Sequence, residues 1–238
     1  MKIALVGYGK MGRAIEKIAL KKGHEIVLKI DVDNARDLNK ENLSKADVAI
    51  EFTGPASAAG NLRICASAGI PAISGSTGWL DELPEIKDAF QNNQVAFLYA
   101  SNFSIGVNIF FELNKKLAAL MAGQDDYKIS MREIHHTQKK DAPSGTAITL
   151  AEQVISEIPA LKNWVNQTSD KPEQLSIISE RIDPAPGTHE IKYSSSIDDI
   201  EIIHTAHNRE GFAGGAVLAA EYIRGKKGVF TMKDVLGF

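Results

Sequence analysis

Short apolar runs and helical patterns alternate along residues 1–103. The apolar runs lie between turn-forming residues and predict β-strands at 3–6, 25–31, 47–53, 71–74 and 94–99. Between them, apolar residues recur with a helical period and predict α-helices at 11–22, 57–68 and 80–92. Repeated strand–helix–strand order implies a parallel sheet covered by helices. The pattern therefore predicts an α/β fold that begins with a Rossmann-like, dinucleotide-binding domain.

The pattern changes after residue 103. A long helix is predicted at 105–121, and the next segment, 127–136, alternates apolar with polar residues as a half-exposed strand does. Further strands are predicted at 175–182, 189–195 and 200–206, with turn-rich sequence between them. These elements predict an α+β domain with an open mixed, mainly antiparallel sheet.

A last helical pattern, 212–224, is expected to pack back on the first domain, because the two ends of a split domain meet. We therefore expect a dinucleotide-binding domain formed by 1–103 and 212–238. Residues 104–211 are expected to form a substrate-binding and oligomerisation domain, whose exposed sheet needs cover from further subunits.

Composition narrows the class of protein. The 238 residues are 44% hydrophobic and carry a formal net charge of −3, so no basic field attracts nucleic acid or a membrane surface. Cys65 is the one cysteine, which excludes an intrachain disulfide and favours a reducing compartment. No apolar stretch has the length of a signal-peptide core or a membrane span. We expect a cytoplasmic enzyme.

The segment between the first strand and the first helix is a dinucleotide-binding motif. Its sequence is G-x-G-x-x-G, and its residues are the first candidates for contact with the cofactor: Gly7, Tyr8, Gly9, Lys10, Met11 and Gly12. Glycines there allow a tight turn and let the backbone approach a pyrophosphate, while the helix N-terminus supplies N–H groups and a positive dipole end. The alternative is an ordinary glycine-rich turn.

Asp31, at the end of the next predicted strand, favours the dinucleotide, because a carboxylate at this separation accepts hydrogen bonds from the adenosine ribose. It would also repel a 2'-phosphate, whereas Lys10, Arg13 or Arg36 could reach one if the loop after Val32 folds back. We expect NADH to be accepted at least as readily as NADPH, and both stay open as cofactors.

Residues 133–146 carry the second candidate site, Glu-Ile-His-His-Thr-Gln-Lys-Lys-Asp-Ala-Pro-Ser-Gly-Thr. The histidines can exchange a proton near neutral pH, and a desolvated Lys139 can protonate a developing negative centre. Ser144, Gly145 and Thr146 are predicted to begin a helix that continues to about residue 155, so their N–H groups and hydroxyls can hold a carboxylate. The segment thus offers an acid together with an anion cradle.

Simpler explanations exist for each part of this segment. Adjacent histidines often end a solvated strand, lysine pairs usually lie on the surface, and Ser-Gly-Thr is a common helix cap. We expect no metal site, because H-E-x-x-H is absent and the pair His204 and His207 lacks an evident third ligand. A nucleophilic role for Ser144 is also disfavoured, since no G-x-S-x-G motif surrounds it.

The sequence resembles the 4-hydroxy-tetrahydrodipicolinate reductase family, also called dihydrodipicolinate reductase, over nearly the whole chain. The resemblance lies in five segments: 7–12, 75–78, 100–106, 135–146 and 209–216. It implies an NAD(P)H-dependent oxidoreductase that reduces 4-hydroxy-tetrahydrodipicolinate to tetrahydrodipicolinate, in the diaminopimelate route to lysine. The substrate is a small cyclic imine with two carboxylates, and the resemblance further implies a homotetramer built through the second-domain sheet.

The resemblance also implies residue roles. His135 would be the general acid and Lys139 a second proton donor. His136, Ser144, Gly145 and Thr146 would hold the substrate carboxylates. The nicotinamide side of the cofactor site would be lined by two segments that follow predicted strands: Gly75, Ser76 and Thr77, and Ala100, Ser101, Asn102 and Phe103.

Some positions depart from the family pattern. The glycine loop is one residue shorter than in many members, and residues 137 and 138 are Thr and Gln where some relatives have basic residues. Surface loops around 158–172 are expected to account for the shorter chain. Two other functions stay open: another imine or amino-acid dehydrogenase on the same architecture, and a non-catalytic NAD(P) sensor, which needs no proton donor.

Overall fold

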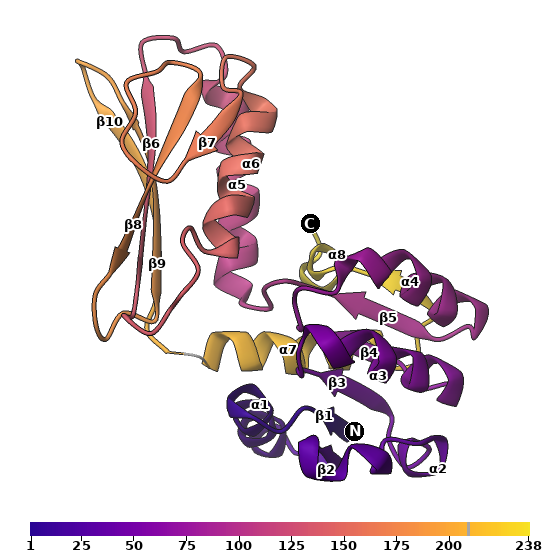
Figure 1. Ribbon diagram of the computed structural model, residues 1–238. Helices are drawn as coiled ribbons and strands as arrows, with labels where there is room; N and C mark the ends of the chain where they lie inside the picture. The colour runs from indigo at the N-terminus through magenta and orange to yellow at the C-terminus, as the bar shows by residue number, and fades with distance from the viewer. Residues whose placement is uncertain (209) are drawn as a thin grey trace. The chain divides into compact units, whose positions relative to one another are not determined.

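The computed structural model describes residues 1–208 and 210–238. The chain divides into two compact units, Met1–Ile105 with Glu210–Phe238, and Gly106–Arg209. Arg209, the first residue of the 209–216 motif, lies outside the described residues. Each unit is described by itself below and can be followed in Figure 1 by its labels.

Unit 1 is built on a parallel sheet that has, within the described residues, six strands in the order β11-β5-β4-β3-β1-β2. Every neighbouring pair is parallel. The strands are β1 (Lys2–Val6), β2 (Glu25–Ile30), β3 (Val48–Glu51), β4 (Ala72–Ser74), β5 (Ala96–Tyr99) and β11 (Gly228–Phe230). The order reverses between β1 and β3, the arrangement that creates a ligand-binding crevice at the carboxyl ends of the strands. The Rossmann-like prediction is confirmed.

Helices cover both faces of this sheet. They are α1 (Lys10–Lys21), η1 (Val32–Asp37), α2 (Lys40–Leu43), α3 (Pro55–Ala68), η2 (Leu80–Glu82), α4 (Leu83–Asn92), α7 (Glu210–Ile223) and α8 (Met232–Leu236). Strand β1 shows the two faces, since Ala4 and Val6 pack in the same cluster as Leu62 of α3. Ile3 and Leu5 point the other way, into a cluster with α1 and α7. Burial of β1 on both faces is what a central parallel strand requires.

Unit 2 contains a mixed sheet in the order β10-β9-β6-β8-β7. Its elements are α5 (Ile105–Met121), β6 (Lys128–His135), α6 (Gly145–Glu157), β7 (Asn163–Val165), β8 (Gln174–Arg181), β9 (Gly187–Ser194) and β10 (Asp199–Ala206). The antiparallel ladders β9–β10 and β6–β9 join eight and seven residue pairs, whereas the parallel ladders β6–β8 and β7–β8 join six and three. Helices α5 and α6 pack on one face of the sheet (Figure 1) around a core that includes Phe110, Leu150 and Ile191.

Five short elements were not expected from the sequence: η1, α2, β7, β11 and α8. Strand β7 lies inside the 158–172 segment that was expected to consist of loops, and it pairs with only three residues of β8. Elements this short contain too few residues for a period to show. In the described part of the chain, no helix combines the length and apolar character needed to cross a membrane.

Candidate active site

The glycine loop of unit 1 is packed so tightly that side chains are excluded. A Cβ on Gly7, whose φ is +98°, would stand 2.1 Å from the carbonyl oxygen of Phe52. A Cβ on Gly12 would stand 2.2 Å from the carbonyl oxygen of Gly7, so this glycine brings α1 against the loop. Gly9 is the N-cap of α1 and is exposed, as is Lys10 behind it. The loop therefore presents backbone and a helix N-terminus, as a pyrophosphate site requires.

Tyr8 lies within this loop, and Asp31 follows the neighbouring strand β2. The Tyr8 hydroxyl bonds to Glu16, and the Nζ of Lys29 lies 4.8 Å from the centre of its ring. The N–H of Gly7 donates to the carbonyl of Ile30, the last residue of β2, so Asp31 lies next to the glycine loop. Its carboxylate is exposed and accepts a hydrogen bond from the N–H of Val32 at 2.9 Å, so it caps η1. Met11 is half-buried and packs on the core of unit 1.

The two other cofactor segments follow β4 and β5. Gly75 is fixed because a Cβ would stand 2.2 Å from the ring of Phe52. Ser76 is buried and hydrogen-bonded, whereas Thr77 is exposed. After β5, the N–H of Ala100 donates to the carbonyl of Ser74 at 3.2 Å, which ties the two segments together. Ser101 is exposed, Asn102 is half-buried and accepts from the Ser104 N–H, and Phe103 is only 2% exposed, so its side chain belongs to the core.

All residues proposed from the sequence for the cofactor are thus gathered at the carboxyl ends of β1, β2, β4 and β5. The sequence reasoning missed Glu51, a fully buried carboxylate at the end of β3. It accepts hydrogen bonds from the hydroxyls of Ser74 (2.6 Å) and Ser76 (2.8 Å) and from the Thr53 N–H (2.8 Å). Glu51 therefore holds the β3 and β4 ends of the cofactor edge together.

In unit 2, His135 lies at the end of β6 and is 8% exposed. Glu133, on the same face of the strand, is fully buried. Its Oε2 is 3.2 Å from Nδ1 of His135, and its Oε1 accepts from the Ser144 N–H at 3.1 Å. Burial alone would raise the pKa of Glu133, but the close His135 ring and the hydrogen bond from the Ser144 N–H outweigh it and hold the pKa well below its usual range.

Ser144 links Glu133 to the helix start that is proposed to bind the substrate carboxylates. It is the N-cap of α6, where its hydroxyl accepts from the Ala147 N–H at 3.2 Å. The same hydroxyl is 3.1 Å from Nε2 of His189, a buried histidine of β9 that sequence reasoning did not single out. Burial lowers the pKa of His189 to about 3, so its ring is neutral at physiological pH. Gly145 is exposed and Thr146 half-buried in the first turn of α6.

His136 and Lys139 both lie in the loop between β6 and α6. The Lys139 Nζ is 2.7 Å from the carboxylate of Asp141, and its side chain is 22% exposed. His136 is half-buried. Arg181 of β8, also missed from the sequence, donates to the carbonyls of Lys139 (3.2 Å) and Asp141 (2.6 Å) and to Oε1 of Glu133 (3.2 Å). Arg181 thus connects the backbone of the loop that carries Lys139 to the carboxylate of Glu133.

Ligand atoms of Glu133, His135 and His189 all lie within 4.8 Å of one another, a spacing compatible with a metal ion. The guanidinium of Arg181 already supplies a cation to this carboxylate, and Ser144 is bonded to both Glu133 and His189. We interpret the group as a hydrogen-bonded network.

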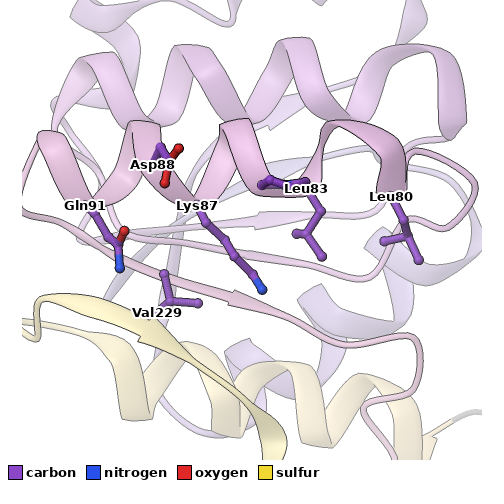
Figure 2. A pocket seen from close by; sticks show the side chains of 7 residues that line it. Leu80, Leu83, Lys87, Asp88, Gln91 and Val229 are labelled. Atoms are coloured by element: carbon purple, nitrogen blue, oxygen red, sulfur yellow. The ribbon is translucent and has the colours of Figure 1, made fainter.

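A hollow of about 520 Å³ lies elsewhere in unit 1 (Figure 2). Its lining comes from η2, α4 and β11: Leu80, Leu83, Pro84, Lys87, Asp88, Gln91 and Val229. None of these residues belongs to the predicted cofactor or substrate groups, so we do not place the chemistry there.

Comparisons with known proteins agree along the whole chain. The models named dihydrodipicolinate reductase, N-terminus and C-terminus, match residues 1–103 and 106–236. The 4-hydroxy-tetrahydrodipicolinate reductase of Christiangramia forsetii is 51% identical over 237 residues, which cover 99% of this chain and 98% of that protein. The corresponding protein of Methanosarcina barkeri is 40% identical over 212 residues, 87% of this chain and 78% of its own length.

A solved structure shows the same fold. The dipicolinate-bound dihydrodipicolinate reductase from Paenisporosarcina sp. TG-14 superposes with a TM-score of 0.76 at 23% identity, over 97% of each chain.

Proposed function

The chain belongs to the dihydrodipicolinate reductase family, and from this membership we propose that it reduces 4-hydroxy-tetrahydrodipicolinate to tetrahydrodipicolinate with NADH or NADPH. The net reaction consumes one substrate molecule, one reduced cofactor and one proton, and releases the product, the oxidised cofactor and water. In this role the protein serves the diaminopimelate route of lysine biosynthesis.

The cofactor fits the glycine loop of unit 1, where Gly7 and Gly12 leave no room for a Cβ and the exposed Gly9 is the N-cap of α1. The N-terminus of this helix suits a pyrophosphate. When bound, the cofactor supplies the hydride. Residues after β1 would hold the pyrophosphate: Gly7, Tyr8, Gly9, Lys10, Met11 and Gly12. Asp31 would bind the ribose, and the nicotinamide would lie against 75–77 and 100–103.

Protonation and substrate binding are assigned to unit 2. His135 is the general acid and Lys139 the second proton donor, while His136, Ser144, Gly145 and Thr146 bind the two carboxylates. The observation that best supports these roles is the direct link, through Glu133, between the ring of His135 and the N-cap residue of α6. An acid and an anion cradle are thereby held in one rigid network, as reduction of a dicarboxylate imine requires.

A coupled assay tests this function. The lysine-pathway synthase generates the substrate in place, and oxidation of NADH or NADPH is followed at several concentrations of each. We expect turnover only when the synthase product is present. Turnover with simple oxo acids plus ammonia, or cofactor binding without turnover on any imine, would contradict the proposal.

For the cofactor we propose that NADH is used at least as readily as NADPH. The exposed carboxylate of Asp31, next to the glycine loop, would repel a 2'-phosphate. In the same assay, a kcat/KM much larger with NADPH than with NADH would refute this preference.

We further propose a cytoplasmic homotetramer. The face of the unit 2 sheet opposite α5 and α6 exposes Ile203, 55% exposed, beside ion pairs such as Arg132 with Glu180. This mixed apolar and charged face is suited to a copy of itself. Light scattering after gel filtration should give four subunits, and Ile203→Glu should reduce that number; a monomeric wild-type protein would contradict the assembly.

The cytoplasmic location is consistent with the single cysteine, Cys65. Its thiol is buried, which raises its pKa to about 12, and it has no second cysteine with which to form an intrachain disulfide.

A further inference from the structure

Glu133 is a buried charge that the proposed chemistry does not yet use. Its side chain is fully buried on β6, two residues before His135, and its low pKa keeps it ionised. A buried carboxylate is costly unless it is paired and hydrogen-bonded. Strand β6 lies between β8 and β9 (Figure 1), and both neighbours contribute a basic side chain to this carboxylate: Arg181 from β8 and His189 from β9.

The oxygen nearest His135 has one close basic partner. Oε2 of Glu133 and Nδ1 of His135 are 3.2 Å apart, and among the described residues neither atom makes a hydrogen bond elsewhere. The Nε2 of His189 is farther from the same oxygen, at 3.9 Å. A small rotation of the ring closes a hydrogen bond from Nδ1–H to Oε2. A carboxylate on one imidazole nitrogen fixes the tautomer and stabilises the protonated ring.

The other oxygen reaches the rest of the site. Oε1 accepts from the Ser144 N–H at the start of α6 and from Arg181, whose guanidinium also holds the carbonyls of Lys139 and Asp141. One carboxylate therefore contacts the ring of His135, accepts a hydrogen bond from Ser144 at the start of the cradle, and is connected through Arg181 to the lysine loop.

We propose that Glu133 is a positioning residue that binds Nδ1 of His135, leaves Nε2 as the proton-donating nitrogen, and keeps Ser144 and the Lys139 loop in register with it. This inference rests on the proposed function for the role of His135, but the tautomer it assigns can be observed without turnover. Gly187 supports the assignment: a Cβ there would stand 3.0 Å from Nε2, so only glycine keeps the approach to that nitrogen open.

The charged or titratable groups around the pair of Glu133 and His135 come from several elements. They are Glu133 of β6, Arg181 of β8, His189 of β9, and Lys139 and Asp141 of the loop before α6. Glu133 is the anion nearest the ring. Removing its charge takes away the anion that the proposal places on Nδ1, so the ring loses the partner that fixes its tautomer.

Glu133→Gln removes the charge but keeps an oxygen that can accept from Ser144 and Arg181. We expect kcat to fall about 10- to 100-fold, within the range of general acid catalysis, with NADH affinity unchanged. Glu133→Asp, which keeps the charge, should recover part of the rate. Glu152→Gln is the matched control, because it removes an exposed carboxylate of α6 in the same unit, away from both the proposed site and the proposed interface.

A second measurement uses long-range ¹H–¹⁵N correlation spectra of the histidine rings, with His135 assigned from a His135→Asn sample. In the wild-type protein above neutral pH, we expect the His135 proton on Nδ1. A neutral ring with its proton on Nε2, or a Glu133→Gln enzyme with unchanged kcat, overturns the inference. If Glu133→Gln does not fold, the wild-type spectra and Glu133→Asp still decide. Failure of the wild-type protein to reduce the substrate would instead overturn the proposed function and leave the tautomer result standing.

Discussion

Two neighbouring glycines of α7 give the sharpest test of how unit 1 is packed. A Cβ on Gly215 would stand 1.8 Å from the carbonyl oxygen of Phe103 and 2.8 Å from its carbonyl carbon, whereas a Cβ on Gly214 meets no atom within 4 Å. Both atoms that oppose Gly215 are backbone, so no side-chain rotation relieves the contact. Gly215→Ala must therefore push α7 and the 100–103 segment apart by more than an ångström.

Substitution by alanine is expected to change the free energy of unfolding in opposite directions at Gly214 and Gly215. In a helix interior, alanine is more favourable than glycine by about 1 kcal/mol, so Gly214→Ala should stabilise the protein by up to that amount. At Gly215 the same gain is offset by overpacking, which typically costs about 1–3 kcal/mol and more when backbone must move. Because 1 kcal/mol shifts Tm by about 2–4 °C in a protein of this size, we expect the Gly215→Ala variant to melt several degrees below the Gly214→Ala variant.

The displaced segment carries residues proposed to line the nicotinamide, so the Gly215→Ala variant should also bind NADH more weakly. Thermal unfolding followed by fluorescence gives the two Tm values, and titration of NADH fluorescence gives the two dissociation constants. Equal Tm values for the two variants would refute the packing argument. A lower Tm with unchanged NADH affinity would refute the placement of 100–103 at the cofactor.

Three further predictions concern the two sites. His135→Ala and Lys139→Ala should lower kcat at least about 100-fold with little change in NADH affinity, and near-normal turnover in stopped-flow assays would contradict their roles. Glu51→Ala leaves the hydroxyls of Ser74 and Ser76 without their acceptor, so it should lower the free energy of unfolding by about 1–3 kcal/mol. Urea unfolding that shows a loss below about 1 kcal/mol would be evidence against the network. Burial depresses the pKa of His189 to about 3 in the folded state, whereas in the unfolded chain it is about 6.5. Between these two pH values the ring binds a proton only when the protein unfolds. Its contribution to stability should be complete above about pH 6.5 and decline by up to about 1.4 kcal/mol per pH unit below it, and wild-type and His189→Asn proteins with parallel pH–stability curves would contradict this.

Much of the fold could be predicted because hydrophobic periodicity reports burial directly. The helix expected at 105–121 has those bounds as α5, and the run at 3–6 is buried on both faces as a central strand of the parallel sheet. The three-residue strands β7 and β11 could not be predicted, because their pairing depends on neighbours far away in the chain. Strand β11, for example, pairs with β5 across more than a hundred residues of sequence.

Site residues that follow one another in the sequence could be predicted. Residues that reach the site only because two strands pair in the sheet could not. Alternation along β6 places Glu133 on the same face as His135, so period-two reasoning extended beyond Met131 could have identified it. Arg181 could not be found this way, because it reaches His135 through the parallel register of β6 and β8. Glu51 is similarly hidden, since its partners come from the end of the next parallel strand, β4. The roles assigned to His135, Lys139 and the cofactor segments stay predictions.

Because unit 1 is completed by Glu210–Phe238, its assembly follows an unusual order during synthesis. Domains generally fold from the N-terminus as they leave the ribosome. Here α1 covers only part of the sheet face formed by Ile3 and Leu5, and the rest stays open until α7 emerges with Ala216 and Val217, after the whole of unit 2 has been made. During synthesis, the sheet of unit 1 therefore stays incomplete until all of unit 2 has been translated. A chain that ends before residue 210 lacks α7 and leaves part of that apolar face exposed to chaperones and proteases.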